Sequence, residues 1–534
     1  MFRHLVWIPL AALLVVAIAA PCASAQSTEA LLDTVQHAAF NYFWNEANAS
    51  NGLIRDRSES GSPASIAAVG FGLSSICTGV DRGWITRSQA VSRVLTTLNT
   101  FWTGPQGSGT SGTIGYKGLF YHFLDMTSGQ RTWTCELSTI DTALLFGGIM
   151  DARQYFSGSS TDEIQIRALA DSITRRADWN WMRNYNLGIL MGWTPEHGFS
   201  GYGQWSGYNE AMIMYIMALG SPTHSVPVNS WNKWISGYSW GTYYGQSYVT
   251  FPPLFGHQYS QCWLDLRHVQ DAYMRNSSRN ITYYVNSQRA TRAARAYCMA
   301  NPGGFTGYSD SLWGLTASDD PISGYLAHGA PPAQSDNGTL SPTAAASSIA
   351  FTPDICVPAI RNMYNSYPLL WGAYGFKDAF NLNPSNNPGV PWYDPDFLGI
   401  DQGPMVLMIE NYRTNAIWNR FMQHADIQKG MQVAGFTSLA GTDGPVAATH
   451  ALFQNAPNPF RARSTIEYRL AAGGRVRVRV FDMAGRVVAS LVDAVQPAGM
   501  HAVTLDGQGL ASGVYQYRLE IGGVALTRKC IRLK

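Results

Sequence analysis

The chain has 534 residues, of which 13% are charged and 12% are aromatic. It is too long for one ordinary domain, and its 46% hydrophobic content excludes intrinsic disorder. The formal net charge of +2 gives no reason to expect nucleic-acid binding. Aromatic side chains at this level serve either a large core or a cleft that stacks sugar rings, and composition alone does not separate the two.

Residues 1–25 have the pattern of a secretory signal peptide. A basic start precedes an apolar run over residues 5–20, and Ala-Ser-Ala at 23–25 fits a cleavage site. The mature chain is therefore predicted to begin near Gln26. The apolar run is short for a membrane anchor, and no other stretch is predicted to span a bilayer.

Six cysteines remain after the predicted signal, and none of them shows the C-x-x-C spacing of a metal site. They lie far apart in the sequence, which favours small buried side chains with at most one disulfide. No metal and no cofactor are predicted. The six are Cys77, Cys135, Cys262, Cys298, Cys356 and Cys530.

Residues 26–436 are predicted to form a mainly helical domain. Amphipathic helices are expected at 86–102, 161–182 and 287–300, and helices apolar on nearly every side at 64–80, 138–156 and 207–222. Thr86 and Gln89 have the spacing of a capping box. Because fully apolar helices need burial all round, the two kinds together suggest two concentric layers, as in an α/α toroid.

Charge and composition change after this domain. Residues 437–455 contain Gly, Ala and Pro without a helical period and are predicted to be a linker. Residues 456–534 carry 12 Lys and Arg against 5 Asp and Glu. About six alternating segments with Gly-containing turns predict a small β-sandwich there. Arg475, Arg477 and Arg479 share one strand face, which favours a solvated surface over a nucleic-acid site.

Two helix starts in the large domain carry acidic residues after aromatic ones. In "WTCELSTIDTALL" (133–145), Glu136 and Asp141 flank the start of an apolar helix. Ser138 or Thr139 could cap that helix with Asp141 in its first turn, which would be a purely structural role. The alternative is that both acids face a cleft.

Glu210 in "GYNEAMIMYIMALGSP" (207–222) is predicted to occupy the same place relative to its helix as Asp141 does. A carboxyl group against Met and Tyr side chains would be desolvated, which raises its pKa and suits a general acid. Asp401 in "LGIDQGPMVLMIENYR" (398–413) precedes Pro404, which fits a first helical turn. Glu410, farther along, is predicted to be structural and to pair with Arg413 or a neighbour.

A fourth segment, "FGHQYSQCWLDLR" (255–267), contains His257 and Gln258. These two are predicted to line the cleft as hydrogen-bonding residues rather than to act as a base. Two carboxyl groups from separate helix starts in an aromatic pocket are the arrangement of a glycoside hydrolase. The distance between them, which distinguishes inversion from retention, cannot be read from the sequence.

Residues 30–436 resemble the bacterial glycoamylase-like domain, a group that includes the endo-β-1,2-glucanases of glycoside hydrolase family 144. The matching stretches include "FNYFWNEANASNGLIRDR" (40–57), "ELSTIDTALL" (136–145), "GWTPEHGFSGYGQWSGYNEAMIMYIMALGSPTH" (192–224), "WGLTASD" (313–319) and "WYDPDFLGIDQGPMVLMIENYR" (392–413). The resemblance implies an (α/α)6 barrel that needs no metal for catalysis. It also implies inverting, endo-acting hydrolysis of β-1,2-glucan.

Carried over to this chain, the resemblance makes Glu210 the general acid and Asp401 the base. Glu136 and Asp141 become cleft residues that support binding. Trp193 and Trp313 become sugar platforms, and Asp319 joins the substrate site together with His257 and Gln258. The alternatives that remain are an exo-acting glucosidase of the glucoamylase type, a polysaccharide lyase, and an exported glycan-binding protein without activity. Few Lys or Arg lie in the candidate segments, which disfavours the lyase.

The tail resembles the C-terminal sorting domains of type IX secretion cargo, which are related to the FlgD-type Ig-like fold. The matching residues are "NAPNPF" (455–460), "VFDMAGRVV" (480–488), "GLASGVYQYRL" (509–519) and the basic end "RKCIRLK". This implies export across an outer membrane, with release or surface anchoring afterwards. The predicted partners are therefore a polysaccharide or oligosaccharide substrate and the secretion machinery.

Overall fold

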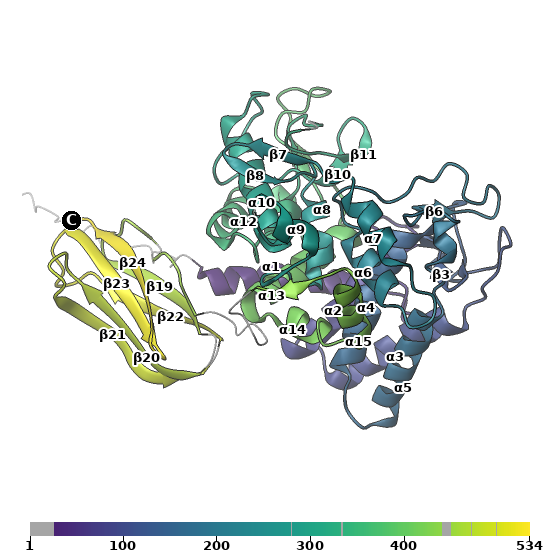
Figure 1. The fold of residues 1–534 in the computed structure, drawn as a ribbon. Helices are drawn as coiled ribbons and strands as arrows, with labels where there is room; N and C mark the ends of the chain where they lie inside the picture. The colour runs from purple at the N-terminus through teal and green to yellow at the C-terminus, as the bar shows by residue number, and fades with distance from the viewer. Residues whose placement is uncertain are drawn as a thin grey trace, which may run out of the picture.

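The computed structural model describes residues 26–278, 280–332, 335–439, 450–455, 457–470, 473–497 and 499–534. Figure 1 shows a large helical body, coloured purple to green, and a separate strand-rich body in yellow-green at the C-terminus. The predicted signal peptide at 1–25 lies outside the described residues, as does most of the predicted linker. No helix within the described ranges is both long enough and apolar enough to cross a membrane.

The large body is built from α-helices joined by long loops. The helices are α1 (Thr28–Asn45), α2 (Ile66–Asp81), α3 (Arg87–Thr103), α4 (Thr139–Tyr155), α5 (Thr161–Arg175), α6 (Met212–Gly220), α7 (Val228–Ile235), α8 (Phe255–Gln258), α9 (Ala272–Asn276), α10 (Tyr283–Ala300), α11 (Pro342–Ala346), α12 (Pro353–Ser366), α13 (Gly399–Thr414), α14 (Ala416–Phe421) and α15 (Ala425–Val433). Three 3-10 turns are η1 (Trp181–Arg183), η2 (Tyr259–Cys262) and η3 (Pro368–Leu370).

Short antiparallel strand pairs occupy the loops between these helices. They are β1 (Ala64–Ser65) with β4 (Phe123–Leu124), β2 (Gly115–Tyr116) with β3 (Leu119–Phe120), β5 (Leu137–Ser138) with β6 (Gly192–Trp193), β7 (Trp240–Tyr243) with β8 (Gln246–Val249), β9 (Val269–Gln270) with β17 (Thr437–Ser438), β10 (Ala317–Asp320) with β11 (Gly324–Ala327), β13 (Trp371–Gly372) with β14 (Gly375–Phe376), and β12 (Thr339–Leu340) with β15 (Phe380–Asn381) and β16 (Trp392–Tyr393). Since β1 runs into α2 and β5 into α4, these pairs fix where the helices begin.

The helices predicted to be apolar on all sides are buried almost along their whole length. This holds for α2, α4 and α6, and also for α13. Helices α2 and α4 approach so closely that a Cβ on Gly70 would lie 2.2 Å from the carbonyl oxygen of Leu144, and one on Gly148 would lie 1.9 Å from that of Gly70. Glycine at both positions therefore allows the two buried helices to pack backbone to backbone.

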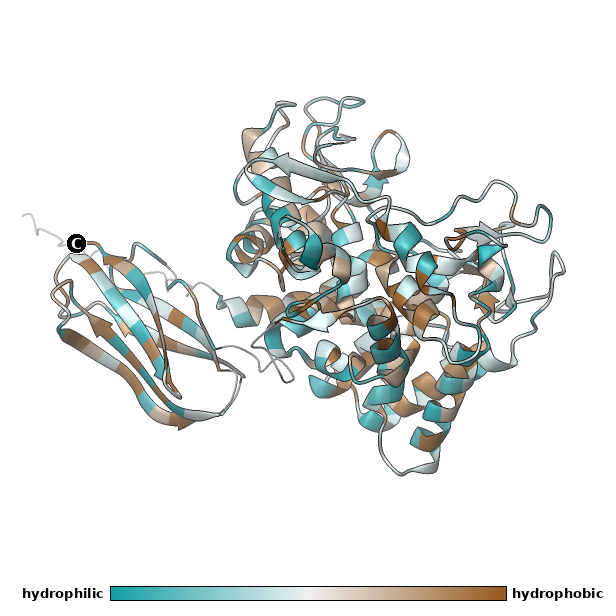
Figure 2. Cartoon of the chain, in the orientation of Figure 1, coloured by the Kyte–Doolittle hydropathy of each residue, from teal (hydrophilic) through white to brown (hydrophobic). Residues whose placement is uncertain are grey.

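The amphipathic helices bury one face each. Thr86 caps α3 and forms the predicted capping box with Gln89. Helix α5 ends at Arg175, short of the predicted 182, because the backbone N–H of Asp178 instead bonds the carbonyl oxygen of Lys117 at 2.9 Å. In Figure 2, α3 and α5 carry both teal and brown stretches, as expected for helices with one buried face.

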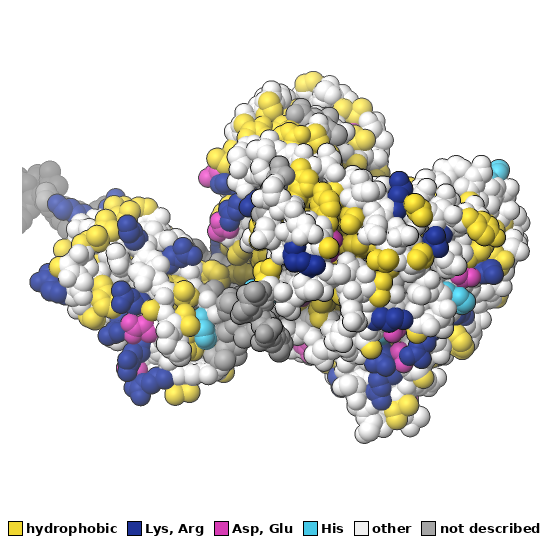
Figure 3. Space-filling view, in the orientation of Figure 1, with side chains coloured by type: hydrophobic (Ala, Val, Ile, Leu, Met, Phe, Trp, Pro, Cys, Tyr) yellow, Lys and Arg dark blue, Asp and Glu magenta, His cyan; other side chains and the backbone are white. Residues whose placement is uncertain are grey.

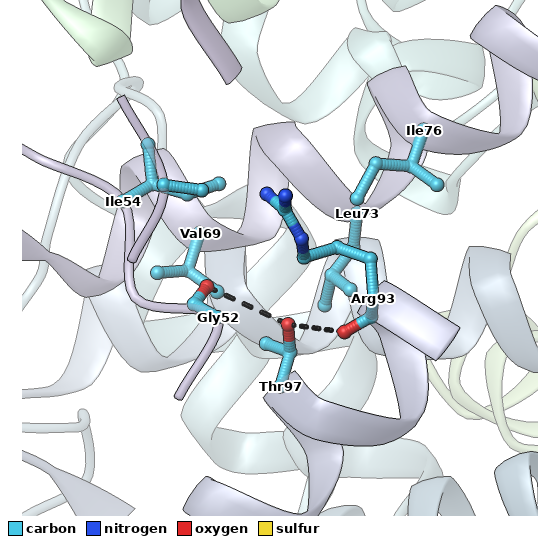
Figure 4. Close-up of a pocket in the computed structure, with 8 residues that line it drawn as sticks. Gly52, Ile54, Val69, Leu73, Ile76, Arg93 and Thr97 are labelled. Atoms are coloured by element: carbon cyan, nitrogen blue, oxygen red, sulfur yellow. Dashed lines mark hydrogen bonds between the residues drawn. The ribbon is translucent and has the colours of Figure 1, made fainter. Parts of the chain in front are cut away.

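Helix α3 is tied to α2 through the loop that contains Gly52. Figure 4 shows the narrow gap between them, with Val69, Leu73 and Ile76 of α2 on one side. The Thr97 hydroxyl on α3 donates to the carbonyl oxygen of Arg93 at 2.9 Å and lies 3.5 Å from that of Gly52. The gap is mostly apolar and contains no carboxyl group, so it is a packing seam and not a candidate site.

The C-terminal body consists of two antiparallel sheets around one core. Its strands are β18 (Ala451–Leu452), β19 (Arg463–Leu470), β20 (Gly474–Phe481), β21 (Val487–Gln496), β22 (Gly499–Asp506), β23 (Gly513–Ile521) and β24 (Val524–Arg532). One sheet has the order β18-β19-β22 and the other β21-β20-β23-β24. Val476, Val478 and Val480 are buried in the shared core, so the alternating pattern of β20 is confirmed.

The three arginines of β20 lie on the outer face, as predicted. Arg475 and Arg477 contact Asp493 on β21 at 2.9 and 3.5 Å, and Arg479 contacts Glu520 on β23 at 2.6 Å. Figure 3 shows Lys and Arg side chains scattered over this body. Paired, solvated charges of this kind fit an ordinary sheet surface. The six cysteines that follow the predicted signal are all free, and five of them are buried.

Candidate active site

Glu210 lies two residues before α6, so the prediction that it sits in the first turn, like Asp141 in α4, is wrong. Asn209 and Ser260 explain the later start. The Asn209 side chain accepts from the N–H of Ala211 at 3.1 Å, and Ser260 Oγ accepts from the N–H of Ile213 at 3.0 Å. The Ser260 hydroxyl also donates to the carbonyl oxygen of Glu210 at 2.6 Å, which fixes the backbone of the glutamate.

The carboxyl group of Glu210 is held in a desolvated position without a charged partner. Its Oε2 atom is buried and has no hydrogen-bond partner. Burial raises the pKa of Glu210 to about 7, and the nearby charge of Asp141 adds to the rise. The group can therefore keep its proton at near-neutral pH, which is what a general acid requires.

Asp401 is the third residue of α13 and is only 2% exposed. The helix begins at Gly399, whose N–H bonds the carbonyl oxygen of Asp56 at 2.8 Å. Pro404 consequently lies inside the helix, and the prediction that it marks the first turn is wrong. Burial raises the pKa of Asp401 to about 7, as do the charges of Asp319 and other neighbouring aspartates.

A cluster of buried aspartates surrounds Asp401. Asp378 is close enough to share a hydrogen bond with Asp401, and its Oδ2 atom accepts from the backbone N–H of Asp319 at 2.6 Å. Burial and the charge of Asp378 raise the pKa of Asp394 to about 9. Arg57 donates to Asp319 Oδ2 at 2.7 Å. Among these four carboxyl groups Arg57 contacts only Asp319, so some of the others must be protonated.

Tyr259 joins the two predicted catalytic residues. Burial raises the pKa of its hydroxyl, and the carboxyl groups of both Asp401 and Glu210 contribute to that rise. Tyr259 belongs to η2 and stacks edge-on against Phe71 of α2, with ring centroids 5.7 Å apart. Glu210, in the turn before α6, and Asp401, in the first turn of α13, therefore both act on the same tyrosine.

Glu136 and Asp141 are brought together by His122, which the sequence reasoning missed. His122 Nδ1 lies 2.9 Å from Glu136 Oε1, and Nε2 lies 3.6 Å from Asp141 Oδ2. Although burial opposes the charged ring, Asp141 and Glu136 raise the pKa of His122 to about 9. A cation therefore lies between these two acids at neutral pH, and Asp141 also accepts from the hydroxyl of Ser138 at 2.5 Å.

Strand pairing explains why His122 reaches this position. Its carbonyl oxygen accepts from the N–H of Ile66 at 3.2 Å, and its N–H donates to the carbonyl oxygen of Glu136 at 3.0 Å. The residue thus lies between the starts of α2 and α4. A single histidine just before the short strand β4 belongs to no sequence motif, so only the non-local hydrogen bonds reveal it.

The predicted site residues form one connected set of charges. The Asp141 charge acts on Glu210 and also on Asp56, whose pKa is raised chiefly by burial. Asp56 neighbours Arg57, which leads through Asp319 to the Asp378–Asp401 pair. Tyr259 completes the path back to Glu210. Glu136, Asp141, Glu210, Asp319 and Asp401 therefore belong to one network of interacting charges, which is called the acidic centre below.

Three other predicted site residues are buried and do not belong to this network. Trp313 is 0% exposed, so it has no free face for a sugar, and its predicted role as a platform does not fit. His257 is buried and its Nε2 contacts the carbonyl oxygen of Phe251 at 3.1 Å, while burial lowers its pKa to about 4. Gln258 donates to the carbonyl oxygen of Ala344 and to Ser348 Oγ. Because these bonds hold neighbouring backbone and side-chain groups in place, His257 and Gln258 have a structural role and do not contact a sugar directly.

Trp193 lies in an aromatic group with little exposed surface. It is 9% exposed and packs against Tyr116 and Trp181, with centroids 5.2 and 5.5 Å away. Trp133 offers a larger free face, because it is 64% exposed and its ring lies 5.3 Å from Phe123, which stacks on His122 at 3.9 Å. Trp133 stands beside Glu136 in the same sequence segment, which is the signal that could have identified it.

Glu410, which the sequence predicted to be structural, lies deeper in α13. It is buried and contacts Arg82 at 2.7 Å, and it accepts from the Thr414 hydroxyl at 2.6 Å. Its partner is Arg82 and not Arg413, which instead bonds Gln36 on α1 at 2.6 Å. Glu410 thus links α13 to neighbouring helices.

Two groups of side chains could in principle bind a cation. Oxygens of Asp319, Asp378 and Asp394 lie within 4.8 Å of one another, and so do the ligand atoms of His122, Glu136 and Asp141. Arg57 already pairs with Asp319 in the first group, and the second contains His122, whose pKa its acidic neighbours raise to about 9. A bound metal would compete with both of these cations, so hydrogen bonding accounts better for the two groups.

Both parts of the chain are similar to known proteins. The family model described as "Putative glucoamylase" matches residues 202–425, and the model of the secretion system C-terminal sorting domain matches residues 456–533. A structure from Bacteroides uniformis with the same glucoamylase description has a TM-score of 0.70 and 35% identity, covering 77% of this chain and 98% of its own.

Two relatives have described activities. The endo-β-1,2-glucanase of Chitinophaga pinensis, solved with sophorotriose and glucose, has a TM-score of 0.70 and 29% identity over 77% of this chain and 99% of its own. The exo β-1,2-glucooligosaccharide sophorohydrolase of Parabacteroides distasonis is 34% identical over 76% of this chain. The present chain spans only 57% of that relative's length.

The structure thus consists of a helical domain with a network of buried acids, followed by a β-sandwich tail. The chain belongs to the glycoamylase-like family and carries a C-terminal sorting domain of a secretion system.

Proposed function

We propose that this protein is a secreted glycoside hydrolase that cleaves β-1,2-glucan. The observation that carries the proposal is that Glu210, before α6, and Asp401, in the first turn of α13, both act on Tyr259, and that burial raises the pKa of each carboxyl group to about 7. A pair of carboxyl groups of which one holds a proton and one can accept a proton is the minimum requirement for hydrolysing a glycosidic bond.

In the proposed reaction Glu210 protonates the glycosidic oxygen as the bond to the leaving sugar breaks. Its buried Oε2 has no competing partner, so its proton is not engaged by another protein group. Asp401 accepts a proton from a water molecule that attacks the anomeric carbon from the opposite face of the ring. The proton later leaves Asp401 for solvent, and Glu210 is reprotonated.

The electrostatics support inversion of the anomeric carbon. Asp401 is not among the groups that raise the pKa of Glu210, and Glu210 is not among the main groups that act on Asp401. Carboxyl groups about 5 Å apart, as in retaining enzymes, would interact strongly. The wider spacing of inverting enzymes leaves room for a water molecule.

The substrate is proposed from the relatives. The sophorohydrolase and the endo-glucanase both act, by their descriptions, on β-1,2-linked glucose chains. The exposed ring of Trp133 beside Glu136 supplies a surface on which a sugar could stack. Endo-acting cleavage is the leading form of the proposal, with Glu136, Asp141 and Asp319 holding sugar hydroxyls, and no cofactor takes part.

Exo-acting cleavage is the second candidate, because the sophorohydrolase acts at the non-reducing end and is 34% identical to this chain. Such an enzyme would release sophorose units only. The chain has both Glu210 and Asp401, and burial raises the pKa of each to about 7, so a purely binding protein is the weaker alternative.

The finer organisation belongs to the same proposal. The buried helices α2, α4, α6 and α13 would form the inner ring of an (α/α)6 barrel that spans residues 26–436. The linker would cover 437–455, and the sorting domain 456–534 would direct the protein through the secretion machinery to the cell surface or the medium.

The test is incubation of the full chain from residue 26 onward with linear β-1,2-glucan, while reducing ends and product sizes are followed. β-1,3-glucan, β-1,4-glucan and starch serve as controls. A range of short β-1,2-linked oligosaccharides supports the endo-enzyme, and sophorose alone supports the exo-enzyme. Tight binding of β-1,2-glucan without new reducing ends would contradict both.

A further inference from the structure

Asp378 is the buried titratable group nearest to the proposed base that the reaction above does not use. It lies between β14 and β15 and is 1% exposed. Its backbone is held on both sides, since its N–H bonds the carbonyl oxygen of Asp396 at 3.1 Å and its carbonyl oxygen accepts from the Ser341 hydroxyl at 2.5 Å. These two hydrogen bonds fix the backbone position of Asp378, and with it the point from which its side chain extends.

The two oxygens of Asp378 have different surroundings. Oδ2 accepts the backbone N–H of Asp319 at 2.6 Å. Oδ1 is buried and has no donor, and the same is true of Oδ2 of Asp401. Two interacting carboxyl groups, each with a buried oxygen that has no donor, are costly unless a proton lies between them. One shared proton satisfies both atoms at once.

The proton belongs on Asp378. Burial and the charge of Asp401 raise the pKa of Asp378 well above its ordinary range, whereas the hydrogen bond with Asp378 lowers the pKa of Asp401. The other groups that face Asp378 are Asp319, Asp394, the hydroxyl of Tyr325, and Arg57 through Asp319. Arg57 is bonded to Asp319, so no cation bonds Asp378 directly among the described residues.

Asp401 has one oxygen left for chemistry. Its Oδ1 makes no hydrogen bond to the residues that the structure describes, and the Asp401 backbone is held by the Thr343 hydroxyl at 3.1 Å. We propose that Asp378 is a positioning residue, which donates its carboxyl proton to Oδ2 of Asp401 and so holds Oδ1 toward the sugar-binding centre. This inference rests on the proposed function, because it assigns Asp401 as the base.

Kinetics of two substitutions separate positioning from simple packing. Asn at position 378 can still donate to Asp401, whereas Leu cannot. We expect Asp378→Asn to keep kcat within about fivefold of the native value, and Asp378→Leu to lower kcat about a hundredfold with KM changed less than threefold, the loss expected for a charge-assisted hydrogen bond.

The pH profile supplies a readout that a packing defect would not move. Without its donor, Asp401 should hold its proton more tightly, so the acid limb of kcat/KM should move up by about one pH unit in Asp378→Leu and stay in place in Asp378→Asn. Asp271→Leu is the matched control, because Asp271 is equally buried but bonds Met274 and Tyr283. A shifted limb in the control, or equal kinetics of the Asn and Leu variants, would overturn the proposal.

Infrared spectroscopy tests the same inference without any activity. At neutral pH the native full chain should show the carboxylic-acid C=O band of Asp378, which disappears in Asp378→Asn. If no band is lost, Asp378 carries no proton and the inference fails even for an active enzyme. If the band is lost but no glucan is cleaved, the proton pair stands and the proposed function fails instead.

Discussion

The acidic centre of the helical domain and the arginine face of the tail use the same chemistry in opposite surroundings. Around Asp401 lie Asp319, Asp378 and Asp394, of which only Asp319 contacts a guanidinium, several oxygens lack donors, and burial raises the pKa of Asp401. On β20 each arginine contacts an exposed or half-buried carboxylate at 2.6 to 3.5 Å. The second arrangement is what stability and solubility allow at no cost, whereas the first is maintained against the cost of desolvation.

The difference teaches where to look for function in this molecule. The alternating arginines of β20 are easy to see in the sequence, but in the structure they are paired with carboxylates and screened by solvent. Buried acids without cations are nearly invisible in the sequence, yet they hold protons at neutral pH. Desolvation is therefore what turns ordinary aspartate and glutamate into an acid and a base.

The largest expected effect concerns the two carboxyl groups themselves. Glu210→Gln and Asp401→Asn should each lower turnover of β-1,2-glucan by about 10²- to 10⁴-fold, because each removes one proton transfer. Steady-state assays of reducing ends measure this. Arg477→Ala on the tail face is the control, and its turnover should match the native protein. Turnover within threefold of native in Glu210→Gln would remove the glutamate from the mechanism.

Burial of Glu210 should also be visible in stability. The pKa of Glu210 is raised from 4.5 to about 7 in the folded chain, so the folded state loses stability relative to the unfolded chain as the pH rises through that window. Gln cannot ionise. Glu210→Gln should therefore gain about 2 kcal/mol over the native protein between pH 4 and pH 8. Urea unfolding at both pH values measures it, and an equal difference at the two values would contradict the burial of this group.

Much of this fold could be read from the sequence, because its signals are local. The capping box at Thr86, the stripe of α3 and the alternation of β20 follow from spacing alone. The end of α5 could not be predicted, because it depends on a hydrogen bond from the backbone N–H of Asp178 to the carbonyl oxygen of Lys117, which is distant in the sequence.

The site could be predicted only in part, for the same reason. Glu210 and Asp401 stand before or at the start of apolar helices, which a sequence displays. His122 and Asp378 reach the centre through pairing between segments that are distant in the chain. Trp313 misled because a sequence shows the aromatic ring but not whether a face is free.

A smaller effect should follow from the cation between Glu136 and Asp141. His122→Ala removes a charge-assisted hydrogen bond and should lower kcat/KM about tenfold. The alkaline limb of the pH profile of kcat/KM should move to higher pH. Without the His122 cation, the negative charge of Asp141 raises the pKa of Glu210 further. His224→Ala, beside Asp178 on the surface, is the control. An unchanged pH profile in His122→Ala would show that the histidine does not influence the acid.

The smallest effect is expected on the tail. Arg475→Ala should leave the midpoint of thermal unfolding unchanged within error, since its pair with Asp493 is exposed and screened. Differential scanning calorimetry checks this. Arg420→Ala is the positive control and should lower the midpoint, because it leaves the buried carboxylate of Asp151 without its partner. A drop in Arg475→Ala as large as in Arg420→Ala would erase the contrast between the two surroundings.

The most direct measurement is the titration of Glu210 itself by ¹³C NMR of protein labelled at glutamate carboxyl carbons, with Glu210→Gln used to assign the signal. Desolvation beside Asp141 predicts a midpoint near pH 7. A midpoint near 4.5, the ordinary value for glutamate, would mean that Glu210 is ionised at neutral pH and cannot serve as the acid.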